Sequence, residues 1–284
     1  MFVEAAAEVV TRMPFAIRLF AGLWLALAVC APLSAQDVEV IEDVVYGHTD
    51  GLAAVYDVAV PAEQNGTAVV FVVSGGFLSN LEQQAYILPV AKPLLDAGFT
   101  VFHLRHPSTP RYTAPEIVGW VRQGVDHIVE HAEEYGVDGD NLGIMGMSTG
   151  GLLALMPALD PQGSRRPAAV VAYMPVADIR PFVGDPSNPA LQFDANLAPS
   201  FSPVDHVTDD DPPVLLIHGD QDEILPIEDH SLRLKSLFDD AHMTSELLVV
   251  RRFGHELFTG QAKATADSAV VEWFDRHLLR GGSR

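Results

Sequence analysis

The sequence predicts an α/β protein: one mostly parallel, eight-stranded sheet with helices on both faces and a small cap segment. Three observations lead to this prediction. Runs of Val, Ile, Leu and Phe recur without polar alternation, which is typical of strands covered on both faces. Segments with helical spacing of apolar residues separate most of these runs. The 284 residues, 48% of them hydrophobic, are enough chain to bury a substantial core.

The first segment of the chain has the features of an export signal. Residues 19–31 form an uncharged apolar run that follows two arginines. A membrane-spanning helix needs roughly 20 apolar residues, so this run is too short to span and has the length of a signal-peptide core. We therefore expect residues 1–35 to be a signal peptide that is cut after Ala35. Met13 offers a cleaner start, in which case residues 1–12 are an over-extended gene start.

Cleavage at this position would deliver the protein to the periplasm or the medium, without a stable membrane anchor. It would also remove Cys30, the single cysteine, so the mature chain would hold no disulfide. Two alternatives stay open: an anchor helix that remains attached, and a lipoprotein modified at Cys30.

Residues 36–284 are expected to form one domain, because the sequence shows no internal repeat and no low-complexity linker. Two early strands are followed by alternating strands and helices, which favours a mostly parallel sheet. The strands are expected over 37–45, 52–60, 68–74, 99–104, 142–147, 168–174, 214–218 and 246–251. The helices are expected over 81–97, 115–135, 152–159, 227–239 and 262–279.

One stretch, residues 181–207, breaks this alternation. It carries five prolines and three phenylalanines and is too long for a simple connection. We interpret it as a candidate cap or substrate loop. The alternative that stays open is a surface excursion whose Phe side chains pack against the core.

The strongest chemical signal is a G-x-S-x-G motif, Gly146 to Gly150, with Ser148 at its centre. It follows an expected strand and opens an expected helix. In such a sharp turn, glycines at 146 and 150 avoid steric clashes and leave the Ser148 hydroxyl exposed above the sheet. The backbone N–H of Thr149, at the start of the helix, then faces the place where an oxyanion would form.

A serine hydroxyl needs a base, and two later segments offer partners. Asp222 follows the strand 214–218, and His255 follows the last strand, so both emerge at the same sheet edge as Ser148. We expect His255 to accept the Ser148 proton and Asp222 to fix the imidazole tautomer. Asp220 is a rival for the acid; its expected role is to shape the turn by Asx-type hydrogen bonds.

The second oxyanion donor is expected in the glycine-rich turn after the third strand. Small residues at 74–76 let backbone N–H groups face the site, and either Gly76 or Phe77 would donate alongside Thr149. An ordinary tight turn is the alternative.

The remaining histidines receive structural interpretations. His127 and His131 lie four apart on an expected helix, but no third metal ligand accompanies them, so a solvated helix face is favoured over a metal site. His206 and His218 are expected to be turn or core histidines. We expect no metal and no cofactor.

The charge of the chain excludes two classes of partner. It carries 38 acidic and 17 basic side chains, for a formal net charge of −21. Nucleic acid and anionic membranes would be repelled by such a surface. The acidity favours solubility and indicates nothing about the reaction.

With these motifs in hand, the chain resembles the α/β-hydrolase superfamily and, within it, the bacterial esterase/lipase branch that includes feruloyl- and acetyl-esterase-like enzymes. The resemblance rests on VVSGGF (72–77), the segments 111–128, 135–151 and 210–226, and FGHELF (253–258). Two departures stand out. The usual His-Gly-Gly-Gly turn reads Ser74-Gly75-Gly76-Phe77, and Thr149 stands where many relatives carry Ala.

The resemblance and the motifs together predict an exported serine hydrolase that cleaves small-molecule carboxylic esters through an acyl-enzyme. Ser148, Asp222 and His255 would be catalytic, and no cofactor would be needed. Two alternatives stay open. One is a serine peptidase acting on short peptides, as in the catalytic domain of prolyl-oligopeptidase-type enzymes. The other is a non-catalytic binding member of the fold, whose usual mark, loss of a triad residue, is absent here.

Overall fold

The computed structural model describes residues 38–256 and 258–279. The expected signal peptide, residues 1–35, lies outside this range. Within it, no helix has the length and apolarity that crossing a bilayer requires.

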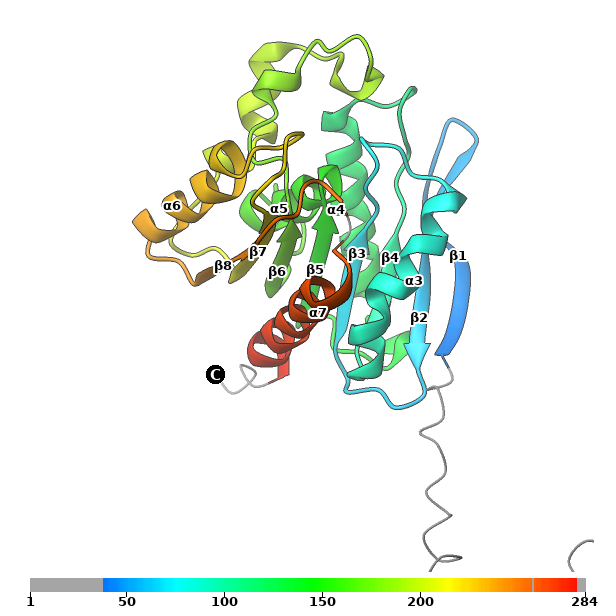
Figure 1. Cartoon of the computed structure of the whole chain (residues 1–284). Coiled ribbons are helices and arrows are strands. Elements are labelled where there is room, and N and C mark those ends of the chain that lie inside the picture. Colours follow the sequence, from blue (N-terminus) through cyan, green and yellow to red (C-terminus); the bar gives the residue numbers. More distant parts are fainter. Residues whose placement is uncertain (1–37, 257, 280–284) are drawn as a thin grey trace, which may run out of the picture. The chain divides into compact units, whose positions relative to one another are not determined.

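The core of the fold is a single eight-stranded sheet, as the sequence predicts (Figure 1). Its spatial order is β1-β2-β4-β3-β5-β6-β7-β8. β1 pairs with β2, and β2 with β4, in antiparallel fashion, and every other pair is parallel. The strand bounds are β1 Val38–Thr49, β2 Leu52–Pro61, β3 Ala68–Val72, β4 Thr100–Leu104, β5 Leu142–Met147, β6 Ala169–Tyr173, β7 Val214–Gly219 and β8 Ser245–Val250.

The register of the parallel strands brings distant segments together at one sheet edge. The end of β3 lies beside the end of β5, where Val72 pairs with Gly146. β5 and β6 end at the same level, with Met147 opposite Tyr173, and Tyr173 lies opposite Ile217 of β7. Carboxyl ends of parallel strands in an open α/β sheet form the usual ligand-binding edge. The turns after β3, β5 and β7 therefore meet at this edge.

Helices cover both faces of the sheet. Two of them, α3 (Leu81–Asp96) and α7 (Gly260–Phe274), pack together on one face (Figure 1). The other face carries α4 (Ala114–His131), α5 (Thr149–Leu159) and α6 (Arg233–Asp240). A 3₁₀ turn, Ala132–Tyr135, extends α4, and π-helical turns precede α6 (Glu228–Leu232) and follow α7 (Asp275–Leu279). All five predicted helices are present, with the last two partly wound as π turns.

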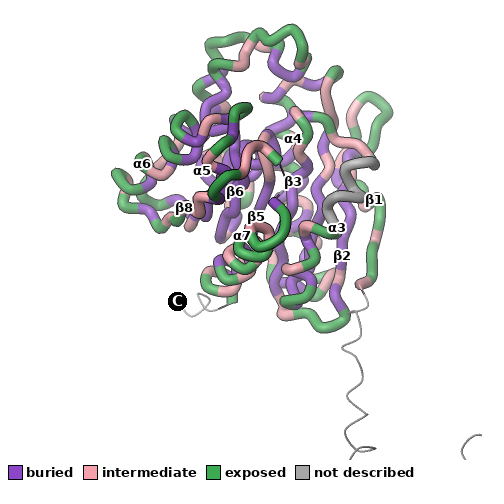
Figure 2. Tube along the Cα trace, viewed as in Figure 1, coloured by how far each residue is buried: buried purple, intermediate pink, exposed green. Residues whose placement is uncertain are grey.

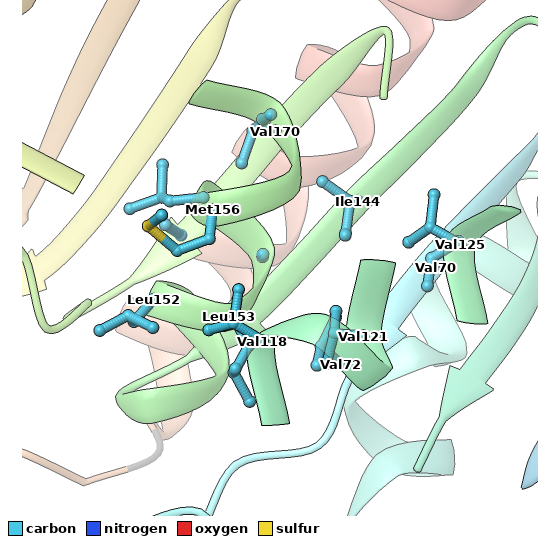
Figure 3. Packing of buried hydrophobic residues seen from close by; sticks show 14 of the residues in the cluster. Val70, Val72, Val118, Val121, Val125, Ile144, Leu152, Leu153, Met156 and Val170 are labelled. Carbon is cyan, nitrogen blue, oxygen red and sulfur yellow. The ribbon is translucent and has the colours of Figure 1, made fainter. Parts of the chain in front are cut away.

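Each face of the sheet has its own apolar core. On one face, alternate strand residues such as Val70, Val72 and Ile144 meet Val121 of α4 and Leu153 of α5 (Figure 3). The intervening strand residues form the second core, against α3 and α7; they include Val69, Phe71, Met145 and Val171. Figure 2 shows the central strands buried between the two helix layers. Burial on both faces explains why these strands are continuously apolar in the sequence.

Residues 181–207 contain neither strands nor α-helices. They form short 3₁₀ turns that arch beyond the sheet, yellow-green in Figure 1; these turns are Arg180–Phe182, Pro189–Leu191, Ala195–Phe201 and Pro203–Asp205. Phe182, Phe193 and Phe201 are partly buried and pack against the main core. A contact with the turn after β3, described below, connects the same segment to the candidate site.

An ion cluster holds the base of this segment. The Asp178 carboxylate accepts hydrogen bonds from Arg180 (2.7 Å), from Arg233 (2.8 Å) and from the Ser202 hydroxyl (3.3 Å). Burial disfavours the charged carboxylate, but the two guanidinium groups outweigh it and lower the pKa of Asp178 well below its ordinary value. The first turn of the segment and α6 are thereby joined through one carboxylate.

Candidate active site

Ser148 occupies the sharp turn between β5 and α5, in a strained backbone conformation. Its φ is 54° and its ψ is −122°, a region that residues other than glycine rarely adopt. The flanking glycines make this turn possible. A Cβ at Gly146 would lie 2.1 Å from the carbonyl oxygen of Gly150, and a Cβ at Gly150 would lie 2.8 Å from the carbonyl oxygen of Val72. The structure thus gives the predicted strand–turn–helix geometry.

Ser148, His255 and Asp222 form a continuous chain of hydrogen bonds. His255 Nε2 lies 2.9 Å from Ser148 Oγ, and His255 Nδ1 lies 2.7 Å from Asp222 Oδ2. The Asp222 side chain is fully buried, whereas 15% of the His255 side chain is exposed. A carboxylate only accepts, so the proton of a neutral His255 sits on Nδ1. Nε2 is then free to accept the proton of the Ser148 hydroxyl.

The Asp222 carboxylate is fixed by its own turn. Its Oδ1 accepts hydrogen bonds from the backbone N–H groups of Ile224 (2.9 Å) and Leu225 (2.8 Å). Burial opposes ionisation, but the Leu225 N–H and His255 favour the charged form more strongly and lower the pKa of Asp222. Asp222 therefore stays ionised in the pH range in which a histidine changes its charge.

His218, predicted from the sequence to be a turn or core histidine, also contacts the Asp222 carboxylate. It is fully buried, as expected, but its Nε2 also lies 3.2 Å from Asp222 Oδ2 and 2.9 Å from the Leu225 carbonyl oxygen. Its Nδ1 lies 2.7 Å from the Ser231 hydroxyl. Burial lowers its pKa, so His218 is a neutral N–H donor to the carboxylate. No sequence pattern marks this second contact, because it depends on the path of the loop that follows β7.

The rival acid, Asp220, lies elsewhere. Its Oδ1 accepts from the backbone N–H of Arg252 (2.5 Å), and its Oδ2 lies 3.3 Å from the Arg251 guanidinium. It ties the turn after β7 to the turn after β8, and this contact with a distant segment differs from the Asx-type hydrogen bond within its own turn that the sequence predicts. The carboxylate in contact with His255 is that of Asp222.

The glycine-rich turn after β3 faces the start of α5. The N–H of Phe77 points at the Thr149 hydroxyl, 3.4 Å away, so this amide is directed toward the residue that follows Ser148. Gly76 and Phe77 both have positive φ, 65° and 71°. The N–H of Thr149 belongs to the first turn of α5, where helical amides have no partner within the helix. The three expected oxyanion residues therefore meet beside Ser148.

His127 and His131 are half-buried rather than on a solvated helix face, because His127 packs against Tyr56, with its Nδ1 3.3 Å from the Tyr56 hydroxyl. The rings of His127 and His131 stack with centroids 4.0 Å apart, and His131 Nδ1 lies 2.8 Å from the His127 carbonyl oxygen. His206 Nε2 lies 3.2 Å from the Pro199 carbonyl oxygen. Within residues 38–256 and 258–279, no group of three or more His, Cys, Asp or Glu side chains could hold a metal ion.

Known proteins resemble this chain in sequence and in structure. The probable carboxylic ester hydrolase LipM of Mycobacterium tuberculosis is 27% identical over 237 residues, 74% of this chain and 54% of LipM, so the chain spans about half the length of that relative. A truncated carbohydrate esterase from gut microbiota superposes with a TM-score of 0.72 at 22% identity, over 86% of this chain and 99% of that one. Thermogutta terrifontis esterase 2, phosphorylated by paraoxon, superposes with a TM-score of 0.65 at 20% identity, over 85% of this chain and 95% of that one.

The two structural matches confirm the α/β-hydrolase fold predicted from the sequence. Residues 56–237, which include the turn after β3, the Ser148 elbow and Asp222, match the BD-FAE family. The chain belongs to the BD-FAE family of the α/β-hydrolase superfamily.

Proposed function

We propose that this protein is an exported serine hydrolase that cleaves carboxylic esters through a Ser148 acyl-enzyme. The observation that carries the proposal is the unbroken hydrogen-bond chain from Ser148 through His255 to Asp222. Its supports are membership in the BD-FAE family and the match to LipM, a probable carboxylic ester hydrolase.

In the acylation step, Ser148 Oγ attacks the ester carbonyl carbon while its proton passes to His255 Nε2. The imidazolium that forms is stabilised by the ionised Asp222 carboxylate, 2.7 Å from Nδ1. The carbonyl oxygen becomes an oxyanion, which the N–H of Thr149 and that of Gly76 or Phe77 stabilise. The bond from the carbonyl carbon to the leaving oxygen then breaks, and His255 gives its proton to the departing alcohol.

In the deacylation step, water takes the place of the alcohol. His255 Nε2 accepts a proton from the water as its oxygen bonds to the acyl carbon, and the same amides stabilise the second oxyanion. Collapse of this intermediate releases the acid and returns the proton to Ser148 Oγ. The overall reaction consumes one ester and one water and yields one acid and one alcohol.

A fluorophosphonate probe tests this proposal, because it reacts with a serine only where a base activates the hydroxyl. The expected result is one adduct on Ser148, found by mass spectrometry, together with hydrolysis of p-nitrophenyl acetate. Adduct and turnover should both be lost in Ser148→Ala, with the melting temperature retained. A wild-type protein that is folded but neither labelled nor active would support the non-catalytic alternative. Faster cleavage of aminoacyl-nitroanilides than of the acetate ester would support the peptidase alternative.

Export is a separate part of the proposal and has its own test. Expression of the full chain in a bacterial host should give a periplasmic or secreted protein whose N-terminal residue is Gln36, as cleavage after Ala35 requires. Protein recovered in the membrane fraction with residues 19–31 still attached would instead indicate an anchor.

A further inference from the structure

The Asn188 side chain joins the segment 181–207 to the glycine-rich turn. The Asn188 amide nitrogen, Nδ2, donates a hydrogen bond to the carbonyl oxygen of Gly76, 3.0 Å away. The two residues are 112 positions apart in the chain. The contact therefore joins an irregular surface segment to the turn that carries the candidate oxyanion donors.

The carbonyl of Gly76 and the N–H of Phe77 belong to the same peptide group. A trans peptide is planar, and its C=O and N–H point in opposite directions. Holding the Gly76 oxygen on the side of Asn188 therefore aims the Phe77 N–H the other way. In the structure this N–H points at Thr149, the residue next to Ser148.

This peptide group needs a restraint from outside the turn. Gly75 and Gly76 have φ values of 108° and 65°, in a region where glycine moves freely, and Phe77 is held at 71°. The next peptide group is fixed separately, because the carbonyl oxygen of Phe77 accepts from the N–H of Thr109 at 3.2 Å. The Gly76–Phe77 group has two partners: Asn188 donates to its carbonyl oxygen at 3.0 Å, and its N–H faces the Thr149 hydroxyl at the longer distance of 3.4 Å.

The Asn188 side chain is itself oriented. Its Oδ1 accepts the backbone N–H of Ala190 at 3.1 Å and so caps the 3₁₀ turn Pro189–Leu191. With the oxygen used in this way, the atom that faces Gly76 must be the NH₂ donor. Ala190 and Leu191 are both buried, which anchors the turn in the core. One side chain thus joins the core-anchored turn to the Gly76 carbonyl.

We propose that Asn188 is a positioning residue for the oxyanion hole, and that the donor it sets is the N–H of Phe77 rather than that of Gly76. This inference rests on the proposed ester hydrolysis. Asn188 does not touch the substrate; it holds the Gly76–Phe77 peptide so that the amide is already aimed when the oxyanion forms.

Asn188→Asp separates the two roles of this side chain. The aspartate keeps an oxygen that can cap the N–H of Ala190, but it places a second oxygen, in place of the NH₂ group, against the carbonyl of Gly76. Removing an oxyanion donor altogether lowers kcat by about 10²- to 10³-fold. Because misorientation loses only part of that stabilisation, we expect kcat for p-nitrophenyl acetate to fall by about 10- to 100-fold, with KM within about twofold of wild type.

A transition-state analogue gives a readout that loss of structure alone would not produce. A trifluoromethyl ketone forms a hemiketal oxyanion on the serine, so its inhibition constant should rise by about the same factor as kcat falls. Asn188→Ala should behave similarly. The matched control is Asp194→Ala, which removes the cap of the next 3₁₀ turn, where Asp194 accepts from the N–H of Asn196, and has no contact with Gly76. This control should keep the wild-type kcat.

The outcomes separate this inference from the proposed function. A wild-type protein that does not hydrolyse esters overturns the proposed function, and with it the basis of this inference. An active wild type whose Asn188→Asp variant keeps its kcat and its ketone affinity overturns the positioning role alone. Equal losses of kcat in Asn188→Asp and Asp194→Ala, with a parallel drop in melting temperature, also overturn it, because they would show that the segment acts only through its folding.

Discussion

Replacing Asp222 by Asn tests how the carboxylate acts on His255. In the native site, Oδ1 accepts from the backbone N–H groups of Ile224 and Leu225, at 2.9 and 2.8 Å, and Oδ2 faces His255 and His218. Two backbone donors can be satisfied only by the oxygen of the new amide. The NH₂ group of that amide is therefore forced into the position of Oδ2, 2.7 Å from His255 Nδ1.

The consequence is the wrong tautomer of His255. With an NH₂ donor opposite it, Nδ1 must accept, so the imidazole proton moves to Nε2, the atom that faces Ser148 Oγ at 2.9 Å. A protonated Nε2 cannot accept the serine proton. The expected loss in kcat is about 10⁴-fold, the known effect of this tautomer change in Ser-His-Asp enzymes, or about 5 kcal/mol of transition-state stabilisation. Stability should fall by only about 2 kcal/mol, because both backbone donors keep an acceptor.

The assay is p-nitrophenyl acetate hydrolysis, with urea unfolding on the same samples. Asp220→Asn is the matched control: this carboxylate contacts Arg251 and Arg252 and not the imidazole, so its variant should keep the wild-type kcat. An Asp222→Asn variant that retains more than about a tenth of kcat would refute the tautomer reasoning. A large loss in Asp220→Asn with little loss in Asp222→Asn would show that the acid was assigned to the wrong residue.

Two further predictions concern stability. Gly146→Ala should destabilise the fold by at least about 3 kcal/mol, because the new Cβ would lie 2.1 Å from the Gly150 carbonyl oxygen. Gly119→Ala is the matched control. Gly119 is an exposed position of α4 with nothing within 4 Å of the new Cβ, so this variant should be about 0.5 kcal/mol more stable than wild type. Urea unfolding measures the free energy of unfolding of both variants, and an equal change in the two would contradict the predicted clash at Gly146. Asp178→Asn should lower the free energy of unfolding by about 2 kcal/mol at pH 7. This loss is smaller than that for a fully buried ion pair, because the partner side chains, Arg180 and Arg233, are 38% and 45% exposed. The folded-state pKa of Asp178 is depressed, so its contribution is fully present above about pH 4, the ordinary Asp value, and is lost as the pH falls toward the folded-state pKa. The stability difference between wild type and variant should therefore shrink at low pH, and a constant difference from pH 7 to pH 3 would contradict this.

The strands and the main chemical residues could be predicted from the sequence because each leaves a local pattern. Buried parallel strands are continuously apolar, and the elbow around Ser148 requires small residues at fixed spacing. The order of Ser148, Asp222 and His255 along the chain, together with strand ends that share one edge, then placed them near one another. These expectations needed no knowledge of side-chain packing.

The contacts that the sequence did not predict involve backbone atoms or irregular segments. Asn188 donates to the backbone carbonyl of Gly76. Because every residue has such a carbonyl, no sequence pattern identifies the one that is contacted. His218 is indistinguishable by sequence from a core histidine, because its second contact, with Asp222, depends on the path of the loop that follows β7. The segment 181–207 has no periodicity, so its 3₁₀ turns and its anchoring to Asp178 through Ser202 follow only from tertiary packing.

The backbone of Ser148 sets catalysis and conformational stability against each other at a single residue. A side chain at φ 54° and ψ −122° stores about 1–3 kcal/mol of strain, which glycine would relieve. The substitution that destroys the nucleophile is thus one that relaxes the chain around it. A screen for thermostability alone would therefore drift toward inactive proteins at this position, and any stabilisation of this fold for practical use has to select for turnover at the same time.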